Sequence, residues 1–488
     1  QHKVNLTESG CVAAVTMLVI WGTLNFSVAS GRVALHFGNI GQAYKDYGVA
    51  YCFANSLLNT GIDKPDGYDT EAVDQLESEE QTQAEVPKTI EGRYPNIIML
   101  QLESFFDPTL WRNNPVQGDP IPMFHFLERN FPSGYLSVPS AGTANTEFEC
   151  ISAMNLDFFG PGEYPYKTIL QKTACESMAF DMKNLGYKAH AVHNNEATFY
   201  DRHKVFAQLG FDTFTPIEYM YDIERNPTGW CKDKVLVGEI EKVLDSSIGS
   251  DFVYTISVQG HGKYPSFEYY CEQIHEMDEF VGQLINMLNT RMEPTVLVLY
   301  GDHLPGFEWT AQEMENESLF QTKYVVWNNV NLPAVKRNVE AYQLAAHVLN
   351  MLDIHEGTML RFHQRHLDAW DTDTQSYLDA MKLLQYDILY GDHEVYGGES
   401  PYQATQLEFG VTPIIQGTTV HNTDQVIVFG GPFNSWSKIC VNGKAADTQY
   451  YSKTRLIAKG VEPKEKEEIT VQQVGRDKIH LGTARKKQ

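Results

Sequence analysis

Apolar runs that alternate with helical patterns are the feature that most constrains the fold of this 488-residue chain. Runs with the length and composition of buried strands lie at 96–102, 188–192, 252–258, 295–300 and 323–327. Helical periodicity fills the intervals, for example at 175–185, 234–244 and 274–288, and continues at 341–352 and 374–384. Strands that alternate with helices predict an α/β domain with a mostly parallel central sheet flanked by helices.

Polar residues follow several of these strands at the point where each apolar run ends. They are Glu103, His193, the segment 259–261 and the pair at 302–303. In parallel α/β sheets, ligands bind outside the carboxyl ends of the strands. This recurrence therefore predicts an active site at that edge. The letters Tyr-Gly-Asp-His at 300–303 recur at 390–393, where they follow a helix and are interpreted as a turn.

The segment 140–149 joins small residues, two threonines and two carboxylates. A threonine hydroxyl becomes a useful nucleophile when its pKa is lowered, and a metal ion is one way to lower it. Together with Thr143, the side chains of Glu103, Asp302 and His303 would form a mixed oxygen and nitrogen site. Such a set suits one divalent cation, Mn²⁺ or Mg²⁺, and the imidazole also allows Zn²⁺. The alternatives are an ordinary turn at Thr143 and a helix cap or solvated strand end at Glu103.

Three further side chains have the chemistry of phosphate ligands. His261 lies between two glycines and could donate to a phosphate oxygen or protonate a leaving alkoxide. His193 supplies a second imidazole, and Arg202 could clamp a phosphate through its planar guanidinium. A histidine in isolation is more often structural. Arg202 is equally compatible with a surface salt bridge to Asp201 or Glu196.

Charge and composition exclude some functions. The formal net charge of −25 argues against a nucleic-acid partner, because binding to phosphates requires a basic face. An apolar content of 42% is that of an ordinary globular protein. The seven cysteines form no C-x-x-C pair and no zinc-ligand spacing, which predicts mostly free, buried thiols.

The chain is expected to have four regions. Residues 1–31 are predicted to contain the end of a transmembrane segment, since 9–31 carry no charge, although a buried or interfacial helix is the alternative. Residues 32–92 form a connector and acidic linker, and 93–398 form the catalytic domain. Residues 405–488 show short strands and an Asn-Gly hairpin signal, which predict a small β-sandwich.

The ordered motifs across the catalytic region resemble those of the lipoteichoic acid synthase family, phosphoglycerol transferases of the sulfatase-like, alkaline-phosphatase-like superfamily. The resemblance covers about 94–390. Its carriers are 102–104, 142–148, 193–202, 260–262 and 301–303. True sulfatases carry a Cys or Ser in the pattern C/S-x-P-x-R, and no cysteine of this chain has that setting; Cys150, for example, is followed by Ile-Ser-Ala-Met. Hydrolysis of sulfate esters is therefore not expected.

The resemblance implies roles for individual residues. Glu103, Thr143, Asp302 and His303 would bind one divalent cation, typically Mn²⁺ or Mg²⁺ with Mn²⁺ as the first candidate, and Thr143 would be the nucleophile. His193, Arg202 and His261 would hold the glycerophosphate group, with Tyr200 lining the same pocket. The resemblance also implies an N-terminal bundle of membrane helices. The β region at 405–488 lies outside the family's minimal pattern and is expected to be an immunoglobulin-like addition.

The function expected from these features is that of a phosphoglycerol transferase in the bacterial cell membrane, with an extracellular catalytic domain. It would move glycerophosphate from phosphatidylglycerol or a related lipid to a hydroxyl acceptor, such as a lipoteichoic acid-type polymer, through a covalent threonine intermediate. Three alternatives stay open. They are phosphoglycerol or phosphoethanolamine transfer to a glycan, phosphodiester hydrolysis, and non-catalytic binding of a glycerophosphate polymer.

Overall fold

The computed structural model describes residues 15, 16, 19, 22, 23, 26, 47, 48, 51, 60–80, 93–139, 142–160, 162–367, 374–422, 424–461 and 468–487. The chain forms two compact units, Gln1–Asp63 with Asp157–Glu163, and Lys64–Leu156 with Tyr164–Gln488. Most of the predicted membrane segment at 1–31 lies outside the described residues, as do most of 32–59 and all of 81–92. None of the helices traced by the described residues combines the length and apolarity needed to cross a bilayer.

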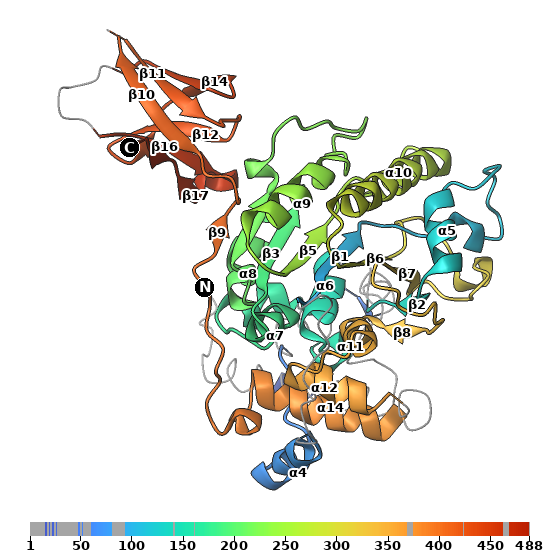
Figure 1. The fold of residues 1–488 in the computed structure, drawn as a ribbon. Helices are drawn as coiled ribbons and strands as arrows, with labels where there is room; N and C mark the ends of the chain where they lie inside the picture. Colours follow the sequence, from blue (N-terminus) through green and yellow to red (C-terminus); the bar gives the residue numbers. More distant parts are fainter. Residues whose placement is uncertain are drawn as a thin grey trace, which may run out of the picture. The chain divides into compact units, whose positions relative to one another are not determined.

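A nine-stranded sheet forms the centre of the larger unit (Figure 1). Its strands, in spatial order, are β8 (Val339–Glu340), β2 (Ser133–Ser137), β7 (Gln321–Asn328), β6 (Thr295–Gly301), β1 (Asn96–Leu102), β5 (Asp251–Ile256), β3 (Lys188–His193), β4 (Thr213–Pro216) and β9 (Glu408–Phe409). The block from β6 to β9 is parallel, and β7 is antiparallel to both β6 and β2. The predicted mostly parallel sheet is therefore confirmed, with one antiparallel strand near its edge.

The two faces of the sheet are covered by different helices, as the alternation of side chains along β1 shows. Ile98 and Leu100 lie in one core with residues of α5 (Pro122–Asn130), α9 (Val235–Ser246) and α10 (Phe267–Arg291). Gln101 belongs to the opposite face, because successive side chains of a strand point to opposite sides. Its Nε2 donates to the backbone carbonyl of Thr143, 3.1 Å away, so α6 (Thr143–Ser152) lies on that face.

Further helices complete the second face and the end of this region. They are α7 (Met178–Asn184), α8 (Arg202–Gln208), α11 (Ala341–Met351), α12 (Thr358–Arg365) and α14 (Thr374–Leu389). Helix α10 begins seven residues before the predicted 274, because the Ser266 side chain caps it by accepting from the Tyr269 amide. The acidic linker contains one helix, α4 (Thr70–Glu80), which contacts α14 and buries Val73.

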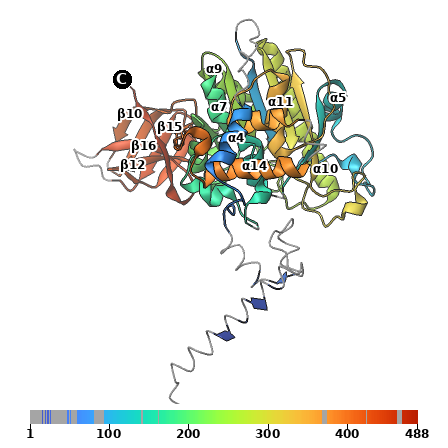
Figure 2. The ribbon, with the colours of Figure 1, turned by 90° about the horizontal axis from the view of Figure 1, so that it is seen from below.

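The C-terminal region consists of two sheets (Figures 1 and 2). One contains β14 (Thr448–Ser452), β15 (Arg455–Lys459), β11 (Gln425–Gly431), β10 (Ile415–His421) and β18 (Arg485–Lys486), and the other contains β13 (Lys444–Ala445), β12 (Ser437–Val441), β16 (Ile469–Val474) and β17 (His480–Thr483). Strand β12 contacts β14 and β15 of the other sheet, as expected for a sandwich. The predicted hairpin joins β12 to β13, with Asn442 and Gly443 both at positive φ.

Candidate metal and nucleophile site

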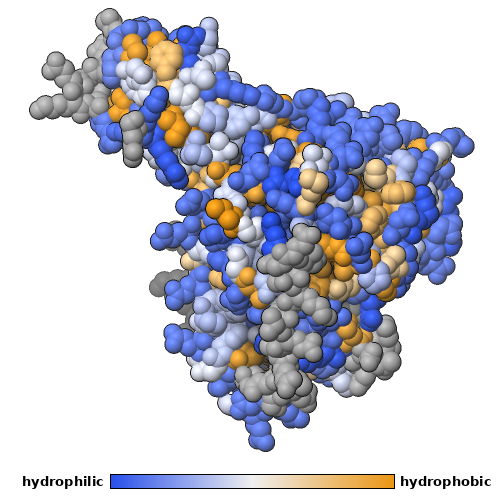
Figure 3. Space-filling view, in the orientation of Figure 1, coloured by the Kyte–Doolittle hydropathy of each residue, from blue (hydrophilic) through white to orange (hydrophobic). Residues whose placement is uncertain are grey.

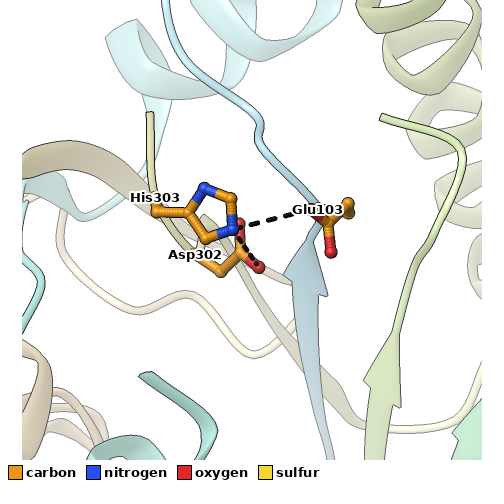
Figure 4. Close-up of side chains that lie close together, drawn as sticks. All are labelled: Glu103, Asp302 and His303. Atoms are coloured by element: carbon orange, nitrogen blue, oxygen red, sulfur yellow. Dashed lines mark ion pairs between the residues drawn. The ribbon is translucent and has the colours of Figure 1, made fainter. Parts of the chain in front are cut away.

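The carboxyl ends of β1 and β6, which are neighbours in the sheet, bring three predicted ligands together. Glu103 follows β1, and Asp302 and His303 follow β6. One ligand atom from each lies within 4.8 Å of the other two, and the described residues contain no second cluster of this kind. His303 Nε2 is 3.5 Å from Glu103 Oε1 and 3.6 Å from Asp302 Oδ2. Figure 4 shows the imidazole edge facing both carboxylates.

Ser104 donates a hydrogen bond to each of the two acidic ligands. It has a positive φ of 51°, which turns the chain sharply at the end of β1. Its amide donates to Asp302 Oδ1 at 2.7 Å, and its hydroxyl donates to Glu103 Oε1 at 2.9 Å. The other oxygen of this carboxylate, Asp302 Oδ2, is buried without a hydrogen-bond partner and lies beside His303.

Thr143 is the first residue of α6, and all ten residues of this helix are buried. Its hydroxyl donates to Glu103 Oε2 over 3.0 Å, which places the predicted nucleophile against the three-ligand cluster. The Thr146 hydroxyl, in contrast, donates to the Asp302 carbonyl and has a structural contact. A helix N-terminus carries positive partial charge and favours an anion at this position. The helix N-terminus therefore favours a Thr143 alkoxide once a cation offsets the negative charges of Glu103 and Asp302.

The residues fit a divalent cation. Glu103 and Asp302 are 3% and 0% exposed, and no Lys or Arg of the described chain pairs with either carboxylate. Burial and the Glu103 carboxylate raise the pKa of Asp302, as expected for neighbouring acids without a cation. Two carboxylates, one imidazole and one hydroxyl form a donor set that Mn²⁺, Mg²⁺ or Zn²⁺ accepts. The unpartnered Asp302 Oδ2 supplies a free ligand atom.

Three histidines near the sheet edge share one arrangement. Nδ1 lies 2.9 Å from the Ile256 carbonyl in His193, 2.7 Å from the Gly262 carbonyl in His261, and 2.8 Å from the Leu304 carbonyl in His303. Since a carbonyl oxygen only accepts, each Nδ1 carries the proton. In the neutral ring Nε2 is then the acceptor. This bond fixes the ring orientation and leaves Nε2 available to a ligand.

His193 is neutral in this setting. Burial lowers its pKa well below the ordinary value, and the positive charge of Arg202 lowers it further. Its buried Nε2 has no partner. A neutral imidazole with this tautomer accepts a hydrogen bond, so His193 suits a hydroxyl of a bound group better than an oxygen of a phosphate.

Arg202, the first residue of α8, is fully buried and paired with Glu147 of α6. Nε donates to Glu147 Oε2 at 3.0 Å, and a second guanidinium nitrogen donates to Oε1. Nη1 donates to the Phe199 carbonyl at 3.2 Å. The alternative of a salt bridge to Asp201 or Glu196 does not occur, because Asp201 pairs with Lys167 and Glu196 with Arg476. The role of Arg202 as a phosphate ligand stays a prediction.

Aromatic rings pack on two of the predicted phosphate ligands, Arg202 and His261. Tyr200 lies against the Arg202 guanidinium, 5.2 Å from the ring centroid, and stacks on Tyr164 at 5.8 Å. Burial raises the pKa of Tyr200, so its hydroxyl stays protonated and can donate a hydrogen bond. Trp230 packs on His261 with ring centroids 4.4 Å apart.

Two glycines permit the close approach of the site loops. A Cβ on Gly260 would lie 2.1 Å from the Glu103 carbonyl oxygen, and one on Gly301 would lie 1.9 Å from that of Phe105. Both distances are far below van der Waals contact, so these positions require glycine. The glycines therefore fix the strand ends that carry Glu103, His261 and Asp302.

Several supporting residues were not predicted from the sequence. Ser104 braces the ligands, Ser257 Oγ accepts from the Glu103 amide at 2.8 Å, and Glu147 pairs with Arg202. Tyr164 and Trp230 supply the stacked rings. Only Ser104 and Glu147 had a usable signal, because they lie inside the motifs at 102–104 and 142–148. The others come from distant segments that only the fold brings together.

The fold and this edge-of-sheet site define an α/β protein of the alkaline-phosphatase-like superfamily. The sulfatase family model matches residues 95–354, and the chain belongs to that family. This result confirms the predicted superfamily, and the lipoteichoic acid synthase resemblance is also confirmed by a relative from Staphylococcus saprophyticus with that name. It is 25% identical over 238 residues, which are 43% of this chain and 35% of the relative.

Other relatives come from Rhizobium meliloti. One is provisionally named a cyclic beta-1,2-glucan modification protein and is 27% identical over 336 residues, covering 61% of this chain and 51% of the relative. The capsular polysaccharide biosynthesis protein RkpI is 28% identical over 231 residues, covering 43% and 41%. The chain therefore spans about half the length, or less, of the curated relatives it matches.

A solved structure confirms the fold. The Streptococcus pyogenes phosphoglycerol transferase GacH, solved in complex with sn-glycerol-1-phosphate, superposes with a TM-score of 0.61. The match covers 70% of this chain and 100% of the GacH chain, at 21% sequence identity.

Proposed function

We propose that this chain is a metal-dependent phosphoglycerol transferase that uses Thr143 as its nucleophile. The observation that carries the proposal is the position of the Thr143 hydroxyl, at the N-terminus of a buried helix and 3.0 Å from Glu103 of the ligand cluster. The donor is phosphatidylglycerol or a related lipid. The names of the relatives, which include a lipoteichoic acid synthase and a phosphoglycerol transferase, support this class of reaction.

A divalent cation, with Mn²⁺ as the first candidate, would be held by Glu103, Asp302, His303 and the Thr143 oxygen, and would supply charge neutralisation and a lowered hydroxyl pKa. The residues of the chain then carry the transfer. The Thr143 oxygen forms a bond to phosphorus, and the bond from phosphorus to the diacylglycerol oxygen breaks. The proton released from Thr143 is matched by the proton that the diacylglycerol alkoxide gains.

His261 is the candidate for carrying this proton to the leaving alkoxide, because its Nδ1–H is fixed on the Gly262 carbonyl and Nε2 is left to face the substrate. Nε2 first takes up the proton and then, as part of the imidazolium, donates it to the diacylglycerol oxygen. In the second half-reaction an acceptor hydroxyl attacks phosphorus, loses its proton, and releases Thr143 with its proton restored. Arg202 and Tyr200 are proposed to line the glycerophosphate pocket. His193 accepts a hydrogen bond from a glycerol hydroxyl through its unpartnered Nε2.

The acceptor is proposed to be a glycerophosphate polymer of the lipoteichoic acid type or a glycan. The glycan candidate is favoured by the names of the two Rhizobium meliloti relatives, which refer to a cyclic glucan and a capsular polysaccharide. The catalytic domain is proposed to face the outside of a bacterial membrane, where lipid donors and cell-surface acceptors meet.

Donor and acceptor profiling tests the proposal. Purified protein with Mn²⁺ is incubated with phosphatidylglycerol or phosphatidylethanolamine vesicles, and diacylglycerol release is measured with cyclic glucan, glycerophosphate polymer or water as acceptor. We expect cation-dependent release from phosphatidylglycerol that a hydroxyl acceptor accelerates. Diacylglycerol release from phosphatidylethanolamine but not from phosphatidylglycerol would mean that the proposed donor is wrong. A release rate that is the same with water alone as with a hydroxyl acceptor would indicate hydrolysis. Binding of the polymer without diacylglycerol release would indicate a binding protein.

A further inference from the structure

The C-terminal sandwich has a charge opposite to that of the chain. Residues 411–488 contain twelve Lys and Arg against seven Asp and Glu, a formal charge of +5, while the whole chain carries −25. A charge asymmetry of this kind between parts of one chain indicates an anionic partner for the basic part.

The outer face of the five-stranded sheet carries an apolar centre. In β11 and β15, Val426, Val428, Leu456 and Ala458 are fully buried, so the alternate residues point outward. Across these strands Ile427 lies opposite Ile457, and across β10 and β11 Val420 lies opposite Ile427. Val420 is 38% exposed and Phe429 is 39% exposed.

Cations and an aromatic ring surround this apolar centre. Phe429 lies opposite Arg455, whose guanidinium packs 3.5 Å from the Tyr451 ring centroid, and Tyr451 is 58% exposed. Lys459 lies opposite Gln425 at one end of β15. At the edge strand β18, Arg485 lies opposite Ile415. A groove of about 700 Å³ there is lined by Ile415, Gly417, Thr418, Phe429, Gly430 and the basic residues 485–487.

No acidic residue occurs in any of these five strands. Asp424 and Asp447 lie outside the strands, next to β11 and β14, and four glutamates at 462, 465, 467 and 468 come between β15 and β16 in the sequence. In the described part of the chain, none of the cations Arg455, Lys459 and Arg485 forms an ion pair with a carboxylate. Figure 3 shows hydrophobic residues among hydrophilic ones on the C-terminal region at the upper left.

We propose that this face, formed by the outward side chains of β10, β11, β14, β15 and β18, docks on the surface of an anionic lipid bilayer. The cations match the negative headgroups, and the apolar centre enters the interfacial layer together with Tyr451. A glycerophosphate polymer offers phosphates and hydroxyls but no apolar surface, and so leaves Val420, Ile427, Phe429 and Ile457 without a matching partner. The combination of cations and exposed apolar side chains therefore selects a bilayer.

Vesicle sedimentation with the full chain tests the proposal, using phosphatidylcholine vesicles with and without phosphatidylglycerol. The double variant Lys459→Gln/Arg485→Gln removes two charges from the face. The matched control Lys444→Gln/Lys478→Gln removes two exposed charges from β13 and from the turn before β17. We expect binding to anionic vesicles to weaken roughly fivefold per charge in the first variant only, and to decrease with salt. Equal binding by both variants overturns the proposal.

Fluorescence separates this contact from any contribution of residues 1–31. Phe429→Trp adds an indole to the centre of the face, and Lys444→Trp adds one to the other sheet. With brominated phosphatidylglycerol in the vesicles, we expect quenching of the added fluorescence at 429 but not at 444. No quenching at 429, or binding of a soluble glycerophosphate polymer that Lys459→Gln/Arg485→Gln weakens instead, contradicts membrane docking. Neither assay depends on turnover, so these results are independent of the proposed enzymatic activity.

Discussion

At the scale of single residues, Arg202 illustrates how burial changes the meaning of a motif. Its guanidinium is fully buried and forms an ion pair with Glu147. Because both side chains are buried, removing one of them leaves the charge of the other uncompensated inside the protein. A loss of activity in a variant that lacks only Arg202 could therefore come from lost stability or from a lost substrate contact. Replacing both members of the pair separates the two effects.

We predict that Arg202→Met destabilises the protein by about 3–5 kcal/mol because the Glu147 carboxylate stays buried without its partner. The double variant Glu147→Gln/Arg202→Met should recover most of this stability. Urea unfolding of both variants measures the difference, and diacylglycerol release measures activity. A stable but inactive double variant supports a phosphate contact by Arg202. A single variant as stable as the wild type contradicts the buried ion pair.

The residue types of the site were predictable because their chemistry is visible in the sequence. Glu103, Asp302 and His303 follow apolar strands, and their convergence was expected from the parallel sheet. The tautomers of His193, His261 and His303 were not predictable, because they depend on carbonyls that the fold supplies. The same is true of the partner of Arg202.

At the scale of elements, the close packing of strand ends determines the site geometry. We predict that Gly301→Ala destabilises the protein by about 3 kcal/mol and displaces Asp302, because its Cβ would lie 1.9 Å from the Phe105 carbonyl oxygen. Gly306→Ala is the matched control, since nothing lies within 4 Å of its added Cβ. Thermal unfolding and Mn²⁺ titration measure both effects. Equal behaviour of the two variants would contradict this packing.

A charged network joins α5, β7 and the loop after β1. His125 Nε2 lies 3.1 Å from Asp107 Oδ2, Nδ1 lies 2.9 Å from Asp119 Oδ2, and Lys323 Nζ lies 3.0 Å from Asp107 Oδ2. The hydrogen bond to Asp107 raises the pKa of His125 to about 9, although burial opposes the shift.

Because the folded pKa of His125 is raised above its ordinary value of 6.5, its contribution to stability is complete below about pH 6.5 and is lost as pH rises through about 9. We predict a loss on the order of 2 kcal/mol between pH 6 and pH 9.5 that is absent in His125→Gln. Urea unfolding at both pH values measures it, with exposed His421→Gln as the control. A pH dependence that persists in His125→Gln would assign the effect to other groups.

The existence of the main elements was predictable from periodicity, and their limits were not. The strand at 96–102 was predicted with its observed bounds, whereas α10 extends further because its start is set by the Ser266 cap. The antiparallel direction of β7 depends on its pairing with β2 and β6, which no local pattern encodes. The contact of α4 with α14 is likewise a contact between distant segments that no local pattern predicts.

At the scale of the whole molecule, the buried carboxylates of Glu103 and Asp302 are expected to couple the stability of the fold to a bound cation. We predict that Mn²⁺ at 100 times its dissociation constant stabilises the protein by about 2.7 kcal/mol, because the ion binds the folded site preferentially. Asp302→Asn should abolish the effect. Asp392→Asn, in the second Gly-Asp-His copy, should preserve it, because His393 forms a left-handed turn there. Chemical unfolding with and without Mn²⁺ makes the comparison, and an equal effect of Mn²⁺ on all proteins would indicate another site.

The most direct measurement is the intact mass of the protein after incubation with phosphatidylglycerol and Mn²⁺, followed by peptide mapping. We expect a glycerophosphate adduct on Thr143, absent in Thr143→Ala, which should stay folded because only a hydroxyl and a methyl group are removed at the helix start. An adduct on another residue, or release of diacylglycerol by Thr143→Ala at the wild-type rate, would contradict the role of Thr143 as nucleophile.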